Sequence, residues 1–195
     1  RRKSGAEGAE VGKYVNSPET PIFNKSRLLF GFHKSKNAIR EAKAAVLVEG
    51  QMDLLMAWQD GVKNIIATSG TALTADHLKN LKRLTDTLVI AFDSDEAGQT
   101  ASERVIDLAS AADLAVKVMP PLPANFKDPA DLVKGKPGML YELISGGRPA
   151  MHYYFNRYLE PVRRDDITVL KKAVRVVLAK IKNISSPIEQ AHWIK

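Results

Sequence analysis

Ala44-Ala45-Val46-Leu47-Val48 is an unbroken apolar run, and it leads directly into Glu49-Gly50. A short run without polar alternation is typical of a strand that is buried on both faces of a parallel sheet. Similar runs follow at 64–68, 87–92 and 114–119, and helical patterns separate them. Strands that alternate with helices predict an α/β fold with a mostly parallel sheet flanked by helices.

The segments between the runs carry start and stop signals of helices. One helix is expected at 54–59, where Asp60-Gly61 ends it. Thr74 is expected to cap a second helix that continues to about Leu84. A third helix is expected at 97–112. The side chains expected to face the sheet from this helix are Ala101, Val105, Leu108 and Ala112.

Composition divides the chain into three expected parts. These are a basic N-terminal segment at 1–43, an α/β domain at 44–135 and a small helical bundle at 136–195. The helices expected outside the central domain are a short one at about 25–30, the end of another at 38–44, and two at 150–159 and 167–184. An aromatic stretch in the bundle is expected to fill a core, and it consists of Tyr153, Tyr154, Phe155 and Tyr158.

Charge is distributed unevenly along the chain. Residues 1–43 carry a net charge of +6, residues 44–131 carry −6, and residues 132–195 carry +7. Basic flanks suit a polyanion such as nucleic acid, although solvated surfaces of mixed charge give the same counts. The chain has no cysteine, which excludes disulfides and zinc sites built on thiolates within it. No apolar run approaches the length of a membrane span.

Four carboxylates are expected at one edge of the predicted sheet. Glu49 follows the first strand, Asp93 and Asp95 follow the third, and Asp53 lies four residues after Glu49. Ligands of open parallel sheets bind beyond the carboxyl ends of the strands. Crowded carboxylates raise one another's pKa and destabilise the fold, and a bound divalent cation removes this destabilisation. The pattern therefore predicts Mg²⁺ or Mn²⁺, and two such ions are the usual device for nucleotidyl transfer.

Asp93 and Asp95 also have a purely structural interpretation. An aspartate before a helix is a favourable N-cap that contributes about 1 kcal/mol. For an isolated Asp-x-Asp after a strand, the cap would be the better interpretation. Here Gly98 follows, and Glu49-Gly50 stands at another strand end, so we favour the metal site.

The order of these motifs resembles the Toprim pattern of primases, topoisomerases, small nucleases and recombination proteins. Val48-Glu49-Gly50-Gln51-Met52-Asp53 and Ala91-Phe92-Asp93-Ser94-Asp95-Glu96-Ala97-Gly98 resemble the primase versions of its two motifs, and 67–74 resembles the segment between them. Upstream, Lys13-Tyr14-Val15-Asn16-Ser17-Pro18-Glu19-Thr20 and Phe23-Asn24-Lys25 match a stretch that we associate with bacterial DnaG-type primases alone. The resemblance extends from about Lys13 to Val133.

This resemblance implies a DNA-directed RNA polymerase that makes short RNA primers on single-stranded DNA by two-metal nucleotidyl transfer. It implies ribonucleoside triphosphates as substrates, a single-stranded DNA template and two Mg²⁺ or Mn²⁺ ions. It also implies a bacterial cytoplasmic location at the replication fork and no membrane. Family members carry a zinc-binding domain and a helicase-binding domain, and we expect neither within this chain. Contact with the replicative helicase would then be made through a domain outside it.

The resemblance also assigns roles to residues. Glu49 would lie closest to the chemistry, as metal ligand or general base, and Asp93 and Asp95 would bind metal. Asp53 and Asp128 would belong to the same acidic cluster and are also expected to bind metal. The residues expected to contact the incoming nucleotide are Lys13, Tyr14, Asn16 and Lys25. The residues expected to contact the nucleic acid are Arg27, Lys34 and Lys36.

The sequence departs from the family pattern at three places. The family usually has an aromatic residue where Gln51 stands and glycine where Ser94 stands. It usually has aspartate at the position of Ala130, whereas Asp131 comes one step later here, so the role of Asp131 stays open.

Two other functions stay open at this point. The chain could belong to another Toprim enzyme, such as a metal-dependent nuclease or a topoisomerase fragment, or it could be a non-catalytic DNA-binding module. A topoisomerase needs a tyrosine nucleophile on a further domain, and nothing marks one. The motif at 16–20 favours primer synthesis over both alternatives.

Overall fold

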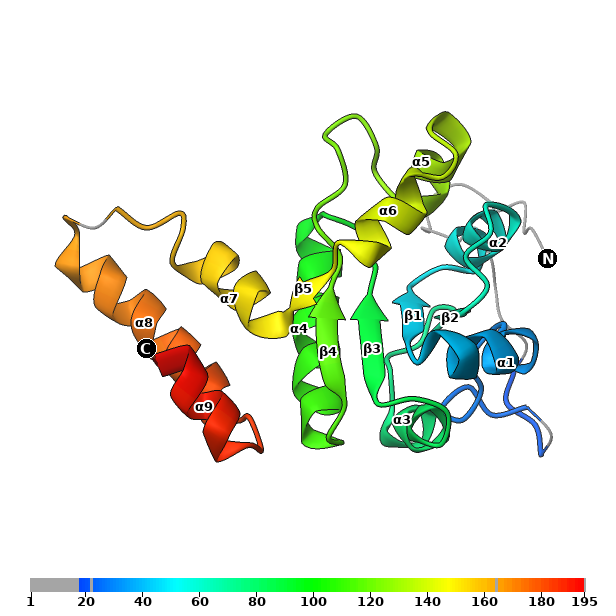
Figure 1. The fold of residues 1–195 in the computed structure, drawn as a ribbon, viewed down its shortest axis with the longest axis horizontal. Helices are drawn as coiled ribbons and strands as arrows, with labels where there is room; N and C mark the ends of the chain where they lie inside the picture. The colour runs from blue at the N-terminus through cyan, green and yellow to red at the C-terminus, as the bar shows by residue number, and fades with distance from the viewer. Residues whose placement is uncertain (1–17, 22, 164, 195) are drawn as a thin grey trace.

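A five-stranded sheet is the centre of the computed structural model, which describes residues 18–21, 23–163 and 165–194. The strand order is β2-β1-β3-β4-β5. The bounds are Ala45–Val48 (β1), Ile65–Ala67 (β2), Thr87–Ile90 (β3), Ala115–Val118 (β4) and Arg148–Pro149 (β5). The first four strands are parallel, and the short β5 is antiparallel to β4 (Figure 1). The predicted fold class is therefore confirmed.

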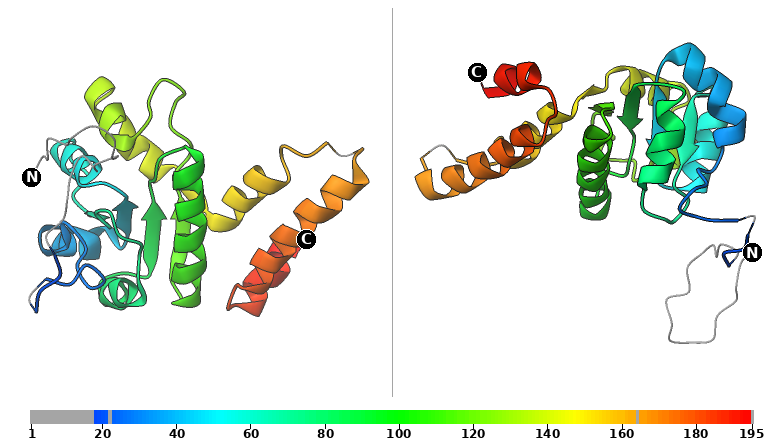
Figure 2. Two further views of the ribbon diagram at one scale, coloured as in Figure 1. Left: turned by 180° about the vertical axis from the view of Figure 1, so that it is seen from behind. Right: turned by 90° about the horizontal axis from the view of Figure 1, so that it is seen from below.

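Helices cover both faces of this sheet (Figures 1 and 2). Their bounds are Phe32–Ala42 (α1), Gln51–Gln59 (α2), Ala75–Lys82 (α3), Glu96–Ala111 (α4), Pro129–Gly135 (α5), Met139–Ser145 (α6), Ala150–Tyr158 (α7), Ile167–Lys182 (α8) and Pro187–Ile194 (α9). Alternate strand residues face opposite sides. Leu47 and Ile90 therefore pack in one core with α1, α3 and α4, whereas Val46 and Val89 pack in another with α2, α5 and α6.

Strand β1 explains the apolar run that decides the fold. It lies between β2 and β3, and its residues pair with both neighbours, for example Val46 with Ile65 and Leu47 with Ile90. All four of its side chains are fully buried. No position of this strand is in contact with water, so no polar alternation is needed.

One local prediction is wrong, and another is correct only in part. Residues 25–30 form a turn instead of a short helix, because Asn24 Oδ1 accepts hydrogen bonds from the backbone N and the Oγ of Ser26, and Phe30 then forms a bridge with Ala67 of β2. The buried face of α4 differs from the expected one, because α4 packs against α7 as well as the sheet. Its buried residues are Gly98, Ser102, Val105, Ile106 and Ala109. Of the four predicted residues, Val105 is buried, and the other three are half-buried and pack against the same core.

Helices α7 and α8 attach to α4 through a polar network. Tyr154 donates from its hydroxyl to Asp107 at 3.1 Å, and Lys180 pairs with the same carboxylate at 2.7 Å. Glu103 accepts from the Tyr158 hydroxyl at 2.7 Å and pairs with Arg157 at 2.8 Å. Tyr154 is 2% exposed, so the prediction that the aromatic stretch fills a core is confirmed there. No helix among the described residues is long and apolar enough to cross a membrane.

Candidate metal and nucleotide site

The loops that follow β1 and β3 meet at the carboxyl edge of the sheet. Glu49 directly follows β1, and Asp93 and Asp95 lie in the loop between β3 and α4. Since β1 and β3 are parallel neighbours, both loops leave the sheet on the same side, where the strand arrows of Figure 1 point. The predicted convergence of these carboxylates at one edge is the direct result of this pairing.

Glu49 has an unsatisfied oxygen. Its Oε1 atom is buried and has no hydrogen-bond partner among the residues that the structure describes. The pKa of this carboxyl is raised, first by burial and then by the negative charges of Asp95 and Asp53. A buried acceptor without a donor costs free energy unless something else supplies positive charge. The geometry at Glu49 therefore fits a bound cation.

Asp93 has the largest shift in the acidic cluster. Its pKa is raised to about 7, first by burial and then by the charges of Asp53, Glu49, Asp128 and Asp95 in that order of size. The other four predicted carboxylates therefore lie close enough to Asp93 to raise its pKa. Without a counterion, this cluster holds more negative charge than the fold favours.

Asp95 and Asp128 serve as helix caps with one oxygen each. Asp95 Oδ1 accepts from the backbone N of Gly98 at 2.7 Å at the start of α4. Asp128 Oδ1 accepts from the backbone N of Asp131 at 2.7 Å at the start of α5. The capping interpretation is therefore correct for Asp95, and its second oxygen is still available to a ligand. Capping and metal binding are compatible at these two residues.

Both carboxylate oxygens of Asp53 accept hydrogen bonds from backbone amides. Oδ1 accepts from the N of Ala130, and Oδ2 accepts from the N of Gly50, each at 3.1 Å. Its side chain is buried, and burial raises its pKa. Asp53 thus connects the loop that holds Glu49 to the first turn of α5, which Asp128 caps. A backbone amide, not a side chain, makes the contact at position 130, where the family usually has aspartate.

Metal binding by these residues is consistent with their donor chemistry. Among the described residues, no three acidic or histidine side chains form a ready-made ligand group. Mg²⁺ usually binds through one or two protein carboxylates, and water and substrate phosphates supply the other oxygens. The unsatisfied oxygen of Glu49 and the raised pKa of Asp93 fit that arrangement.

The predicted basic residues are distributed around a neighbouring cavity. Lys25 and Lys34 line it together with Gln51, which follows the Glu49-Gly50 turn. Arg27 lies 4.0 Å from Asp76 of α3 and is exposed, and Lys36 is exposed on α1. The remaining predicted nucleotide contacts, Lys13, Tyr14 and Asn16, lie outside the described residues.

Two sequence models match this chain in separate segments. The model described as Toprim-like matches residues 46–133, which contain all five carboxylates of the cluster. The model described as the N-terminal domain of the DNA primase catalytic core matches residues 2–36. Over these two segments the chain matches the catalytic core of the bacterial DnaG-type DNA primases. The two segments fit the catalytic core of that family in the order expected from the motifs.

Individual relatives agree with this match. The DNA primase of Enterococcus faecalis is 33% identical over 192 residues, and that of Clostridium acetobutylicum is 36% identical over 186 residues. These matches cover 96% and 94% of this chain but 30% of each relative. The chain thus spans about three tenths of the length of these primases.

Solved primase structures share the fold. The RNA polymerase domain of Mycobacterium tuberculosis primase has a TM-score of 0.80 at 28% identity, and the match covers 99% of this chain and 62% of that domain. A DnaG primase catalytic domain bound to single-stranded DNA has a TM-score of 0.78 at 27% identity, with coverage of 95% and 61%.

His77 takes part in the cap of α3 and also contacts the N-terminal segment. It is fully buried, and its Nδ1 accepts from the backbone N of Thr74 at 3.2 Å. Its Nε2 then donates to the carbonyl of Lys25 at 3.1 Å. Burial lowers the pKa of His77, which favours the neutral ring that this pairing requires. The spacing Thr74-x-x-His77 resembles a capping box and was the available signal.

Ser94, at a position where the family usually has glycine, joins two loops of the site. Its Oγ accepts from the backbone N of Leu122 at 3.1 Å, and its carbonyl accepts from Gln99 Nε2 at 3.0 Å. Leu122 lies in the segment after β4 that leads to Asp128. The serine hydroxyl therefore connects the Asp93–Asp95 loop to the segment that leads to Asp128.

Ser94→Ala is expected to lower the free energy of unfolding by about 1 kcal/mol, because the Leu122 amide loses its acceptor. Ser94→Gly is expected to cost about 0.5–1 kcal/mol more, because glycine adds freedom to the unfolded chain. Urea unfolding of both variants measures these differences. An Ala variant as stable as the native chain would show that the hydroxyl contact contributes nothing.

Proposed function

We propose that this chain is the catalytic core of an enzyme that makes short RNA primers on a single-stranded DNA template. The observation that carries the proposal is the unsatisfied Glu49 oxygen beside Asp93 and Asp95, in a chain whose residues 2–36 match the primase core. A nuclease or topoisomerase shares the carboxylates but has no reason to share that segment. The single-stranded DNA bound by one related catalytic domain supports the choice of template.

In the proposed reaction, the 3′-oxygen of the growing primer attacks the α-phosphorus of a ribonucleoside triphosphate, and the bond to pyrophosphate breaks. Glu49, Asp93 and Asp95 would hold one or two divalent ions, with Asp128 beside them. When bound, such ions shield the triphosphate charge and align the attacking and leaving oxygens. The free oxygen of Glu49 is suited to hold an ion or to accept the proton of the 3′-hydroxyl.

The proposed substrate contacts lie beside this cluster. Lys13, Tyr14, Asn16 and Lys25 would bind the incoming nucleotide, and the template would contact Arg27, Lys34 and Lys36. Lys and Arg side chains bind phosphates by charge and release counterions as they do so. The replicative helicase is the proposed protein partner, through a part of the protein outside this chain.

Primer synthesis tests the proposal directly. The chain and its full-length parent protein are each mixed with single-stranded DNA, labelled ribonucleotides and Mg²⁺ or Mn²⁺, and the products are separated on a gel. Short RNA that needs the template and disappears with EDTA is the expected result. Cleavage of the DNA, or no RNA from the full-length protein with either metal, would overturn the proposal and favour a Toprim nuclease.

A further inference from the structure

A tyrosine of α7 holds the first turn of α4 from outside the helix. The hydroxyl of Tyr153 donates to the backbone carbonyl of Gln99 at 3.0 Å, across 54 positions of the chain. Gln99 lies in the first turn of α4. A carbonyl oxygen has two lone pairs, so it can accept this hydroxyl in addition to a helical N–H. Burial raises the pKa of Tyr153, so the hydroxyl keeps its donating proton at neutral pH.

Gln99 is also bound to the loop between β3 and α4. Its side-chain Nε2 donates to the carbonyl of Ser94 at 3.0 Å, and its backbone N donates to the carbonyl of Asp95 at 2.9 Å. One position earlier, the backbone N of Gly98 donates to Asp95 Oδ1 at 2.7 Å. The loop is therefore fixed to the same turn of α4 that Tyr153 holds.

Helix α7 is itself fixed to the sheet. Strand β5, Arg148–Pro149, pairs with β4 and leads directly into α7. Met151 and Tyr154 of α7 are buried in the core that lies on the α4 side of the sheet. Tyr153 lies between these two residues in the sequence and packs against the same core. Its hydroxyl therefore has a defined position relative to the strands from which the carboxylate loops extend.

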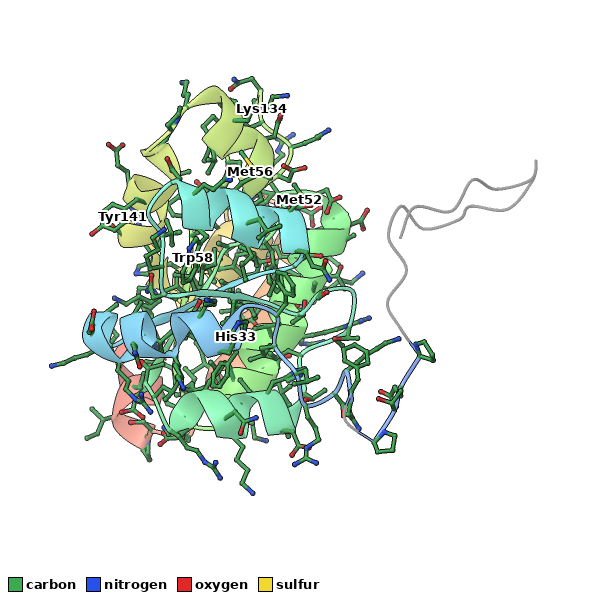
Figure 3. The ribbon with its side chains drawn as sticks, turned by 90° about the vertical axis from the view of Figure 1, so that its right-hand side faces the viewer. His33, Met52, Met56, Trp58, Lys134 and Tyr141 are labelled. Atoms are coloured by element: carbon green, nitrogen blue, oxygen red, sulfur yellow. The ribbon has the colours of Figure 1, made fainter. Side chains whose placement is uncertain are left out.

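The two loops of the site are supported from different edges of the sheet. Asp53 of α2 accepts from the backbone N of Gly50 and holds the loop of Glu49. Figure 3 views the molecule from this side, with Met52 labelled on α2 in front and α4 behind it. Helix α7 lies at the opposite edge, beside β5 (Figure 1). Removal of the Tyr153 hydroxyl is therefore expected to loosen the loop between β3 and α4 selectively.

We propose that Tyr153 is a positioning residue of the metal site. Its hydroxyl fixes the first turn of α4, and Gln99 connects that turn to the loop of Asp93 and Asp95. Mg²⁺ demands near-ideal octahedral geometry, so a loop that holds its carboxylates less firmly binds the ion less tightly. Tyr153 acts through α4 and not by contact with the ion. The inference deepens the proposed function and rests on its metal site.

Hydrogen exchange of the Gly98 amide tests the inference without metal or nucleotide. Gly98 is buried and its N–H is bonded to Asp95, so its exchange reports local opening of the loop from α4. Tyr153→Phe is expected to speed up this exchange in EDTA by about three- to tenfold, the effect of one lost hydrogen bond. The amide of Ile106, further along α4, is expected to change by less than about twofold. A uniform change along α4 would show a general loss of stability and would overturn the inference.

Tyr158→Phe is the matched control. Tyr158 lies on the same helix, and its hydroxyl donates to the side chain of Glu103 of α4 at 2.7 Å. The variant loses the same group from the same pair of helices, but its partner lies in the second turn of α4. Exchange of Gly98 is expected to stay within about twofold of the native rate in this variant. Equal acceleration in both variants, or no acceleration in Tyr153→Phe, would overturn the inference.

Titration with Mg²⁺, followed by the Gly98 amide resonance, gives the readout at the metal site. Affinity is expected to fall by about three- to tenfold in Tyr153→Phe and to stay near the native value in Tyr158→Phe. Gln99→Ala keeps the carbonyl that Tyr153 binds but removes the amide bound to Ser94, so a similar loss is expected. Equal affinities in all four proteins would overturn the inference. If the native chain binds no Mg²⁺, the proposed metal site fails, whereas the exchange rates still decide whether Tyr153 holds the loop.

Discussion

Asp93→Asn is expected to stabilise the metal-free chain at pH 8 and to remove most of its metal-dependent primer synthesis. The native carboxyl has a pKa of about 7, because burial and four neighbouring carboxylates oppose its charge. Asparagine keeps the shape but has no charge. The group is half-buried, so solvent screening limits the expected gain in unfolding free energy to about 1–2 kcal/mol.

The pH dependence of this gain follows from the direction of the shift. Below pH 3.8, the ordinary value for Asp, the carboxyl is protonated in both the folded and the unfolded state, and the charge contributes no difference. Between 3.8 and about 7 the unfolded state ionises first, so the native chain loses stability as the pH rises. The difference in unfolding free energy that favours Asp93→Asn therefore grows over this pH range and reaches its full size above it. Urea unfolding in EDTA at pH 5, 6, 7 and 8 measures it.

Asp86→Asn is the matched control, because Asp86 precedes the same strand at its opposite end. Its side chain is 82% exposed and pairs with Lys82, so its loss is expected to cost stability slightly at every pH. Mg²⁺ is expected to stabilise the native chain more than Asp93→Asn, since the ion neutralises the charge that the variant lacks. Two results would contradict the cluster as described. One is a stability difference between Asp93→Asn and the native chain that does not change with pH, and the other is an equal gain in stability from Mg²⁺ in both proteins.

The activity of Asp93→Asn is expected to fall by about 100-fold or more in the primer assay, because a preorganised charge that holds the reacting groups is lost. The variant is thus predicted to be more stable and less active. A general loss of folding cannot produce this combination. Activity that stays within a few fold of the native level would place Asp93 outside the metal-binding group.

The strands and helices that position the site can be predicted from local sequence patterns. An apolar run followed by Glu49, and a second followed by Asp93 and Asp95, are enough to place three carboxylates at one sheet edge, because parallel neighbouring strands end together. Thr74 caps α3 as predicted, because a side-chain cap depends on residues within one turn. Local chemistry and the rules of parallel sheets are therefore sufficient to predict the position of the site.

The contacts that shape the site involve the backbone of distant residues, which sequence patterns do not reveal. Ala130 donates to Asp53 across 77 positions, and Leu122 donates to Ser94 across 28. Any residue except proline can supply such an amide, so no residue type marks the partner. The turn at 25–30 was missed for a similar reason, because pairing of Phe30 with β2 overrides the local helical preference.

Gly98→Ala is expected to lower the free energy of unfolding by about 3 kcal/mol or more, although alanine normally stabilises a helix by about 1 kcal/mol relative to glycine. A methyl group at position 98 would lie 2.3 Å from the carbonyl oxygen of Asp93 and 3.1 Å from Glu49 Oε1. The first contact is with backbone, which cannot rotate away, so α4 must shift from the loop that holds Asp93.

Gly146→Ala is the matched control for this steric conflict. Its backbone φ of −77° suits any residue, and a methyl group there meets its nearest neighbours at 3.5 Å, which is ordinary contact. Urea unfolding is expected to show little change for Gly146→Ala and a large loss for Gly98→Ala, together with loss of the Mg²⁺-induced gain in stability. If Gly98→Ala were as stable as the native chain, α4 could not lie as close to the Asp93 backbone as the structure places it. Glycine at this position would then be dispensable for bringing the two carboxylate-bearing loops together.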